Sequence, residues 1–129
     1  MNRRNCLQAL ALTATTALAT KAADKNPIIL IVNLEVDPAK EKTMVANYHK
    51  TFKPMISKQP GFVKVDLMKL EGAKVGTAPA NWNYALLISF ESEKQRVEWV
   101  ARDEHQSVWP TIENQLKGKK FDAILYQTV

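Results

Sequence analysis

The order of the apolar segments limits the possible folds of this chain more than any other feature. Four segments show the apolar runs or two-residue alternation of β-strands, and two segments between them repeat apolar residues at helical spacing. The order is strand, helix, strand, strand, helix, strand. Two βαβ halves in this order predict a ferredoxin-like α+β fold, a four-stranded antiparallel sheet with both helices on one face. The predicted strands are 28–36, 62–70, 84–90 and 121–128.

Local residues indicate where the helical segments begin and end. Asp37 before Pro38 predicts a helix start, because aspartate accepts from free N–H groups and proline is tolerated at the first helical position. Ser92 is expected to cap the second helical segment. Proline removes one backbone hydrogen bond from a helix, so a proline inside each segment should kink or divide it. The prolines are Pro54 and Pro110, and the expected ends are Gln59-Pro60-Gly61 and Gly118.

Two segments are expected to be loops. Segment 71–83 is longer than most hairpin connections and carries Trp82 near its end. It either folds over a pocket mouth or forms an exposed tip in which Trp82 anchors the next strand. The basic run from Lys117 to Lys120 is expected to be a solvated turn.

Alternation also assigns the strand side chains to the two faces of the sheet. One face carries the apolar set of the first strand together with Val63, Val65 and Leu67. In this fold the helices cover only one face of the sheet, so the other face has no helix over it. The other face has too much apolar surface to be left in water. Burial against a second copy is the simplest solution, so we expect a homodimer. The first set is Ile28, Leu30, Val32, Leu34 and Val36; the second is Ile29, Ile31, Asn33, Lys64, Asp66, Met68, Leu87 and Ser89.

The first 22 residues have the three regions of a signal peptide. Arg3 and Arg4 give a charged start, an Ala/Leu/Thr-rich run follows, and small residues before position 23 offer cleavage points. The run is too short to span a bilayer. The paired arginines resemble a twin-arginine signal, with the general secretory route and a plain N-terminal tail as alternatives. The sequence therefore predicts an exported protein, periplasmic or extracellular, with its domain at 27–129.

Charge and metal-ligating residues exclude several classes of protein. The formal charge of +5 falls by three when the N-terminal segment is removed, which gives little support to a nucleic-acid partner. Cys6 is the only cysteine, so the processed chain has no disulfide and no thiolate. His49 and His105 are the only histidines and belong to no metal-binding motif. We expect no metal and no cofactor.

Segment 90–116 concentrates the large aromatic and ionisable side chains. His105 and Trp109 are four positions apart, so they share one helix face, and Trp99 precedes them. A related pattern occurs in the first helical segment at an offset of 56 residues, either as a trace of repetition or by chance. The two patterns are His49, Pro54, Ile56 and His105, Pro110, Ile112.

Residues 27–129 resemble the antibiotic biosynthesis monooxygenase superfamily of dimeric α+β barrels. In that superfamily two sheets pack back to back, and each subunit has a ligand pocket between its own sheet and helices. The matching features are Val36-Asp37-Pro38, Gln59-Pro60-Gly61-Phe62, and Phe90-Glu91-Ser92 followed by Trp99 and His105.

The resemblance implies three possible functions. The first is a monooxygenase that acts on a small phenolic or quinone-like compound without a cofactor. The second is a non-catalytic dimeric domain that binds a small ligand. Heme binding is the third and is weaker, because Trp109 stands where heme-degrading relatives have the iron-ligating histidine. Val32 stands in place of their asparagine, and Asn33 faces the other way.

For oxygenation, the resemblance implies a pocket that holds an aromatic ring and a base. A histidine can deprotonate a phenol, because its unperturbed pKa lies near neutrality. Tryptophan can stack on an aromatic ring, although core packing is the alternative role for these side chains. For the histidines the alternative is a half-buried ring bonded to a carbonyl. The predicted catalytic residues are His105 and His49, and the predicted pocket residues are Tyr48, Tyr84, Phe90, Trp99 and Trp109.

Overall fold

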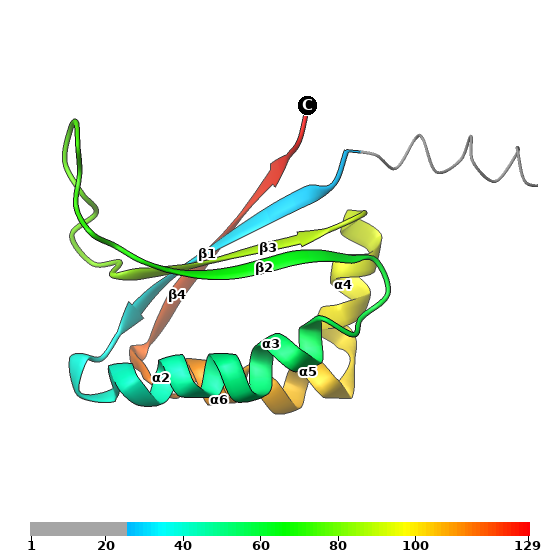
Figure 1. The fold of residues 1–129 in the computed structure, drawn as a ribbon, viewed down its shortest axis with the longest axis horizontal. Coiled ribbons are helices and arrows are strands. Elements are labelled where there is room, and N and C mark those ends of the chain that lie inside the picture. Colours follow the sequence, from blue (N-terminus) through cyan, green and yellow to red (C-terminus); the bar gives the residue numbers. More distant parts are fainter. Residues whose placement is uncertain (1–25) are drawn as a thin grey trace, which may run out of the picture.

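Residues 26–129 are described by the computed structural model, and the predicted signal peptide lies outside them. Four strands form one antiparallel sheet in the order β2-β3-β1-β4, and the helices cover one of its faces (Figure 1). This is the predicted ferredoxin-like architecture. The strands are β1 (Ile28–Val36), β2 (Phe62–Lys69), β3 (Tyr84–Phe90) and β4 (Leu116–Gln127).

The two helical connections are divided into short pieces. Pro54 lies in the first turn of α3, directly after a π-helical turn, and Pro110 begins α6, so each proline lies beside an irregularity in its helical segment. The full break in the second segment is at Arg102, which has an extended backbone. The first connection consists of η1 (Pro38–Lys40), α2 (Glu41–Asn47), the π-helical turn η2 (Tyr48–Phe52) and α3 (Lys53–Ile56). The second consists of α4 (Glu93–Ala101), α5 (Asp103–Val108) and α6 (Pro110–Glu113).

Side-chain caps start both connections where the sequence predicted them. The Asp37 carboxylate accepts from the Ala39 N–H at 3.0 Å. The Ser92 hydroxyl accepts from the Gln95 N–H at 3.2 Å. Each bond satisfies an N–H group that has no partner within its helix.

The core lies between the helices and one face of the sheet. Every second residue of β1 from Ile28 onward is buried, and Leu34 and Val36 are fully covered. Met44 and Ile112 from the two helical connections close the core from the other side. Burial of each such side chain contributes about 1.5–3 kcal/mol, so this layer supplies most of the stabilisation.

The predicted start of β4 was wrong. The strand begins at Leu116, which pairs with Val36, and Gly118 lies inside it instead of ending a helix. Gly118 and Lys119 both have positive φ, and the register shifts beside them. The run Lys117 to Lys120 is exposed, as expected of a solvated turn, but it forms an irregularity within the strand.

The predicted face of Val63 was also wrong. A register shift between Phe62 and Lys64 leaves Val63 exposed, whereas Val65 is buried as expected. An extra residue in one strand reverses the alternation on one side of it. The sequence pattern of β2 gives no indication of this shift.

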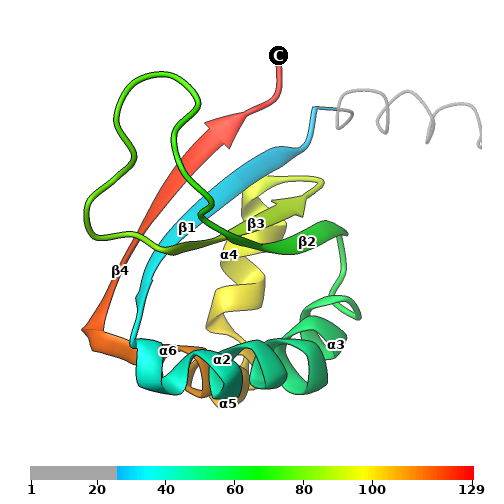
Figure 2. The same cartoon turned by 60° about the vertical axis from the view of Figure 1, so that its left-hand side comes forward.

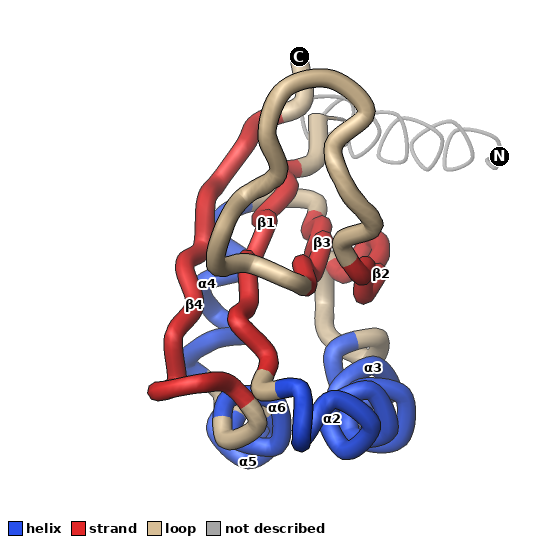
Figure 3. The backbone as a smooth tube through the Cα atoms, turned by 90° about the vertical axis from the view of Figure 1, so that its left-hand side faces the viewer, coloured by secondary structure: helices blue, strands red, loops and turns tan. Residues whose placement is uncertain are grey.

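The sheet face away from the helices is partly apolar. Ile29, Ile31 and Leu87 are half-buried there, and Ile124 and Tyr126 of β4 are exposed. β4 is an edge strand of the sheet (Figure 2). Segment 70–83 rises from the ends of β2 and β3, away from the helical layer (Figure 3). Within residues 26–129, no helix combines the length and apolar character needed to cross a bilayer.

Candidate functional site

A cavity of about 220 Å³ lies between the sheet and the second helical connection. Its wall is almost wholly apolar, and the polar side chains on it are those of Arg96 and His105. Its size and lining are those of a site for a small apolar ligand with one polar group. The apolar wall consists of Leu30, Val32, Ile88, Phe121 and Ala123 from the sheet and Phe52, Trp99, Val100 and Trp109 from the helices.

Aromatic rings hold His105 in place on this wall. The Trp99 indole meets its imidazole edge-on, with 5.1 Å between ring centroids. The Trp109 indole lies nearly parallel to it at 6.3 Å and in turn contacts Phe121 of β4 at 5.1 Å. Such contacts fix the orientation of the imidazole.

A break in the second connection brings His105 next to Trp99. These residues are six positions apart, so on a continuous helix of 3.6 residues per turn they would point in different directions. Arg102 has an extended backbone (φ −79°, ψ 153°), which separates α4 from α5 and redirects the chain. Acidic residues open α5, Asp103 and Glu104, and this is a helix-start pattern that sequence reasoning missed.

The surroundings of His105 favour its neutral form. Burial lowers the pKa of the imidazole, and the positive charge of Arg96 lowers it further. The Nδ1 atom lies 3.5 Å from the side-chain nitrogen of Gln106, which itself donates to the Val100 carbonyl at 2.9 Å. A neutral imidazole keeps a lone pair that can accept a proton.

Arg96 forms an ion pair at the cavity wall. Its Nε and Nη2 donate to the two carboxylate oxygens of Glu93 at 2.7 and 2.6 Å. The hydrogen bonds from Arg96 lower the pKa of Glu93, so the carboxylate stays ionised. Sequence reasoning missed Arg96, because an acidic and a basic residue three positions apart on a helix usually form a solvated pair.

The structure brings three of the seven predicted site residues together. His105, Trp99 and Trp109 share the cavity wall. Phe90 is fully buried in the core. Tyr48 is also buried, where it contacts Phe52.

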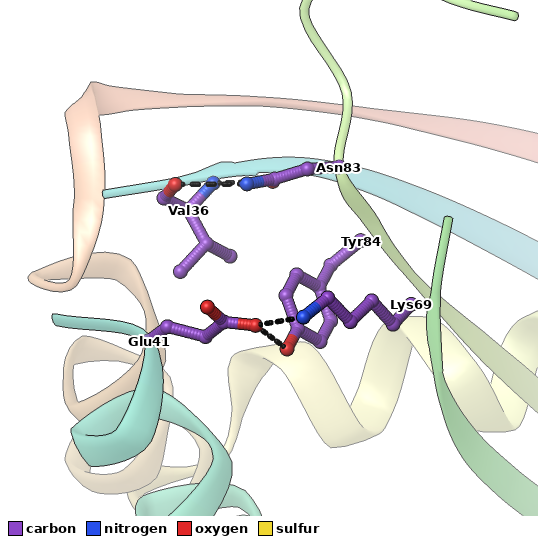
Figure 4. A network of polar contacts seen from close by, with 5 residues as sticks. All are labelled: Val36, Glu41, Lys69, Asn83 and Tyr84. Carbon is purple, nitrogen blue, oxygen red and sulfur yellow. Dashed lines mark hydrogen bonds and ion pairs between the residues drawn. The ribbon is translucent and has the colours of Figure 1, made fainter. Parts of the chain in front are cut away.

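His49 and Tyr84 lie apart from the cavity. His49 is exposed and packs edge-on against Tyr48. The Tyr84 hydroxyl donates to the Glu41 carboxylate at 2.5 Å, and Lys69 pairs with the same carboxylate at 2.7 Å (Figure 4). Burial, followed by the bond to Glu41, raises the pKa of Tyr84 to about 12. This network joins α2 to the sheet.

Asn83 makes a second link beside that network. Its amide accepts from the Val36 N–H at 2.8 Å and donates to the Val36 carbonyl at 3.0 Å (Figure 4). The side chain thereby extends the pairing of β1 beyond Tyr84, the first residue of β3. Trp82, the preceding residue, is half-buried and lines a second hollow that includes Met68 and Ala85.

The residues of the cavity do not fit heme. Val32 is on the wall, whereas Asn33 lies on the opposite face and donates to Asp122 at 2.9 Å. Trp109 cannot ligate iron through its indole N–H, which is a donor only. Within residues 26–129, no cluster of three histidine, cysteine or acidic side chains could hold a metal ion.

Comparison with known proteins shows the fold. No protein-family model matches the chain, and no curated protein matches its sequence. A dimeric ferredoxin-like protein of unknown function from Jannaschia sp. CCS1 is 10% identical, with a TM-score of 0.66 over 78% of this chain and 97% of that one. A candidate antibiotic biosynthesis monooxygenase from Bordetella bronchiseptica is 17% identical, with a TM-score of 0.66 over 81% and 99%.

A third structure comes from an oxygenase. SnoaB, a cofactor-independent oxygenase from Streptomyces nogalater, is 13% identical in its solved mutant form, with a TM-score of 0.59 over 78% of this chain and 90% of that one. The ferredoxin-like fold of the antibiotic biosynthesis monooxygenases is therefore the fold of this chain. At such low identities the likeness concerns the fold alone.

Proposed function

We propose that the domain oxygenates a small phenolic compound bound in the cavity, using O₂ and no metal or flavin. The observation that carries this proposal is an imidazole held by two indoles on the wall of an otherwise apolar cavity. An apolar cavity of about 150 Å³ is known to take up benzene, so about 220 Å³ suits a substituted single ring or two fused rings.

The proposed reaction begins with a proton transfer. His105 accepts the hydroxyl proton of the bound phenol, which leaves an electron-rich phenolate between the indoles. One electron passes from the phenolate to O₂, the resulting radical pair combines to form a carbon–oxygen bond at a ring carbon, and the peroxide anion takes back the proton from His105 to become a hydroperoxide. Loss of water from this hydroperoxide gives the quinone. One oxygen atom enters the substrate, the other leaves as water, and the ring supplies all four electrons.

The neutral state of His105 suits this role. An imidazole with a lowered pKa accepts the proton and releases it readily to the peroxide anion, so the base is regenerated after each turnover. The apolar wall keeps water from the phenolate and the peroxide intermediate. The likeness to an oxygenase that needs no cofactor supports this choice of reaction.

A non-catalytic ligand-binding domain is the second candidate. The observation that favours it is the packing of the site, in which Trp99 is only 2% exposed and also contacts Phe52. A side chain buried to this extent serves the core in addition to any ligand. In this case the cavity would bind the same aromatic compounds without consuming oxygen.

Oxygen uptake separates the two candidates. The purified protein is incubated with a panel of naphthols and hydroquinones, and O₂ consumption, H₂O₂ release and quinone absorbance are followed. Consumption that is lost in His105→Ala and kept in His49→Ala supports oxygenation, because the exposed His49 does not line the cavity. Binding without O₂ consumption supports the second candidate. Absence of both binding and consumption would overturn the proposal.

We also propose that the protein is a homodimer. The half-buried Ile29, Ile31 and Leu87 and the exposed Ile124 and Tyr126 form a continuous apolar area on the sheet face away from the helices. Association buries such an area, and a two-fold axis does so with one self-complementary surface. Ferredoxin-like proteins of this fold from Jannaschia sp. CCS1 and Bacteroides fragilis are dimeric, which supports the proposal.

We propose in addition that the N-terminal segment directs export of the protein from the cytoplasm. Fractionation of cells that express the full chain with a C-terminal tag tests it, and a processed product outside the cytoplasm is the expected result. Replacement of Arg3 and Arg4 by lysine identifies the route, because a twin-arginine signal depends on the arginine pair. Retention of the unprocessed chain in the cytoplasm would contradict export.

A further inference from the structure

Arg96 places a cation on the apolar wall of the cavity. It precedes Trp99 by three positions on α4, so the two side chains share the helix face that borders the cavity. The Arg96 side chain is 19% exposed. An arginine in this position has lost most of its water and gains from any acceptor within reach.

The hydrogen bonds to Glu93 leave part of this guanidinium free. A guanidinium has five N–H donors, and the two bonds to Glu93 run from Nε and Nη2. Donors on Nη1 therefore remain for a ligand. The carboxylate orients the guanidinium and also competes with a ligand for its charge.

The charge of Arg96 acts at the position where a bound hydroxyl would lie. Arg96 and His105 line the same cavity, and the charge of Arg96 adds to burial, the larger cause, in lowering the pKa of His105. A hydroxyl that hydrogen-bonds to this imidazole experiences the field of the same charge. The field that disfavours imidazolium favours a phenolate, because the two groups carry opposite charges when ionised.

We propose that Arg96 is the oxyanion-binding residue of the cavity and that the cavity selects the ionised form of an aromatic hydroxyl. This inference rests on the proposed function and specifies the charge state of its substrate. His105 takes the proton, Arg96 holds the phenolate oxygen, and the indoles hold the ring. No other cation lines the cavity among the described residues.

The test measures the ionisation of a bound phenol. The probe is 4-nitrophenol, whose ionised form has its own visible absorption band, and 4-nitroanisole serves as the neutral probe of the same ring. Both are titrated in the absence of oxygen against the wild-type protein, Arg96→Met and Glu93→Gln. Methionine keeps the apolar stem of the side chain and removes the charge.

Wild-type protein is expected to bind the nitrophenolate about tenfold more tightly than the phenol, which lowers the pKa of the bound probe by about one unit. Arg96→Met abolishes this shift and leaves 4-nitroanisole binding unchanged. Glu93→Gln enlarges the shift, because it removes the competing carboxylate. This second variant keeps the test decisive if Arg96→Met does not fold.

Two failures can be told apart. An unchanged shift in Arg96→Met, or no shift in the wild-type protein that still binds 4-nitroanisole, overturns the role of Arg96 and leaves the proposed function standing. Absence of binding for both probes overturns the proposed function itself.

Discussion

The imidazole of His105 and the indole of Trp109 lie nearly parallel, with 16° between their planes and 6.3 Å between their centroids. Trp99 contacts the same imidazole from another direction. Aromatic rings therefore occupy much of the space in which water would stabilise an imidazolium, and the neutral imidazole is the favoured form.

This arrangement predicts how His105 titrates. Its pKa in the folded protein lies below the ordinary value of 6.5, mainly because of burial and in part because of Arg96. Arg96→Met should raise this pKa. NMR of the imidazole C–H protons measures it directly, since the chain has two histidines and His49→Ala assigns the signals. An unchanged pKa in Arg96→Met would show that the charge of Arg96 does not reach the imidazole.

The same shift predicts how folding stability depends on acidic pH. A histidine with a lowered folded pKa takes up its proton more readily in the unfolded state. Its contribution to stability is therefore fully present above pH 6.5 and is lost as pH falls through the lower folded pKa. Urea unfolding at pH 7.5 and pH 5 should show this loss in the wild-type protein and a smaller one in His105→Gln. Equal losses of stability in the wild-type protein and His105→Gln would show that titration of other groups causes the pH dependence.

Tyr84 predicts a loss of stability at alkaline pH. Burial and the bond to Glu41 raise its pKa from 10.0 to about 12 in the folded protein. A raised pKa contributes stability that is fully present below pH 10 and is lost as pH rises through 12. Tyr84→Phe should flatten the fall in unfolding free energy between pH 10 and 12.

Tyr48 makes that flattening incomplete. Burial, together with the charge of Asp66, raises the pKa of Tyr48 as well, so part of the alkaline dependence should persist in Tyr84→Phe. Tyr48→Phe in the same background should remove this remainder. A pH dependence identical in Tyr84→Phe and the wild-type protein would show that the bond to Glu41 does not persist in solution.

The sequence predicted the layers of the fold because alternation and capping act locally. The buried face of β1 and the caps Asp37 and Ser92 depend on residues within a few positions of each other. The shift beside Val63 and the irregularity at Gly118 depend on how strands pair, which no local pattern contains. These features were therefore missed or misplaced.

In the candidate site, too, the sequence predicted the local relationships and missed those that depend on tertiary structure. His105 and Trp109 share a face because they are four positions apart, and this relationship was visible in the sequence. The contact of His105 with Trp99 requires the extended backbone at Arg102, and the contact of Trp109 with Phe121 requires tertiary packing. Helical spacing alone could not distinguish the exposed His49 from the half-buried His105.

The apolar sheet face predicts how the oligomeric state responds to charge. Ile124→Lys, alone or with Ile31→Lys, places a cation in the proposed interface and should convert the dimer to single chains. Val75→Lys makes the same change on the exposed 70–83 segment and should leave the dimer intact. Light scattering during size-exclusion chromatography gives the mass. A wild-type mass of one chain, or a dimer that survives both isoleucine changes, would place the interface elsewhere or exclude it.

Two glycines with nearly equal backbone angles allow strain and steric clash to be separated. Gly61 (φ +83°) and Gly76 (φ +82°) both lie where side chains are disfavoured by about 1–2 kcal/mol. A Cβ on Gly61 would lie 2.3 Å from the Gln95 amide oxygen, whereas a Cβ on Gly76 would meet open space. Gly61→Ala should therefore lower the free energy of unfolding more than Gly76→Ala, by roughly 0.5–1.5 kcal/mol, the net value of the hydrogen bond that Gln95 loses when it moves.

Removing the Gln95 side chain tests whether the steric clash causes the greater loss of stability in Gly61→Ala. The Gln95 side chain packs at the start of α4, where its amide oxygen accepts from the Ser92 hydroxyl at 3.0 Å, so it cannot move without losing this bond. Gly61→Ala measured in a Gln95→Ala background should cost no more than Gly76→Ala does, because only the backbone strain remains. Urea denaturation of the four variants gives the free energies. If the excess cost of Gly61→Ala survives in that background, the strain lies in the turn before β2 and not in its packing against α4.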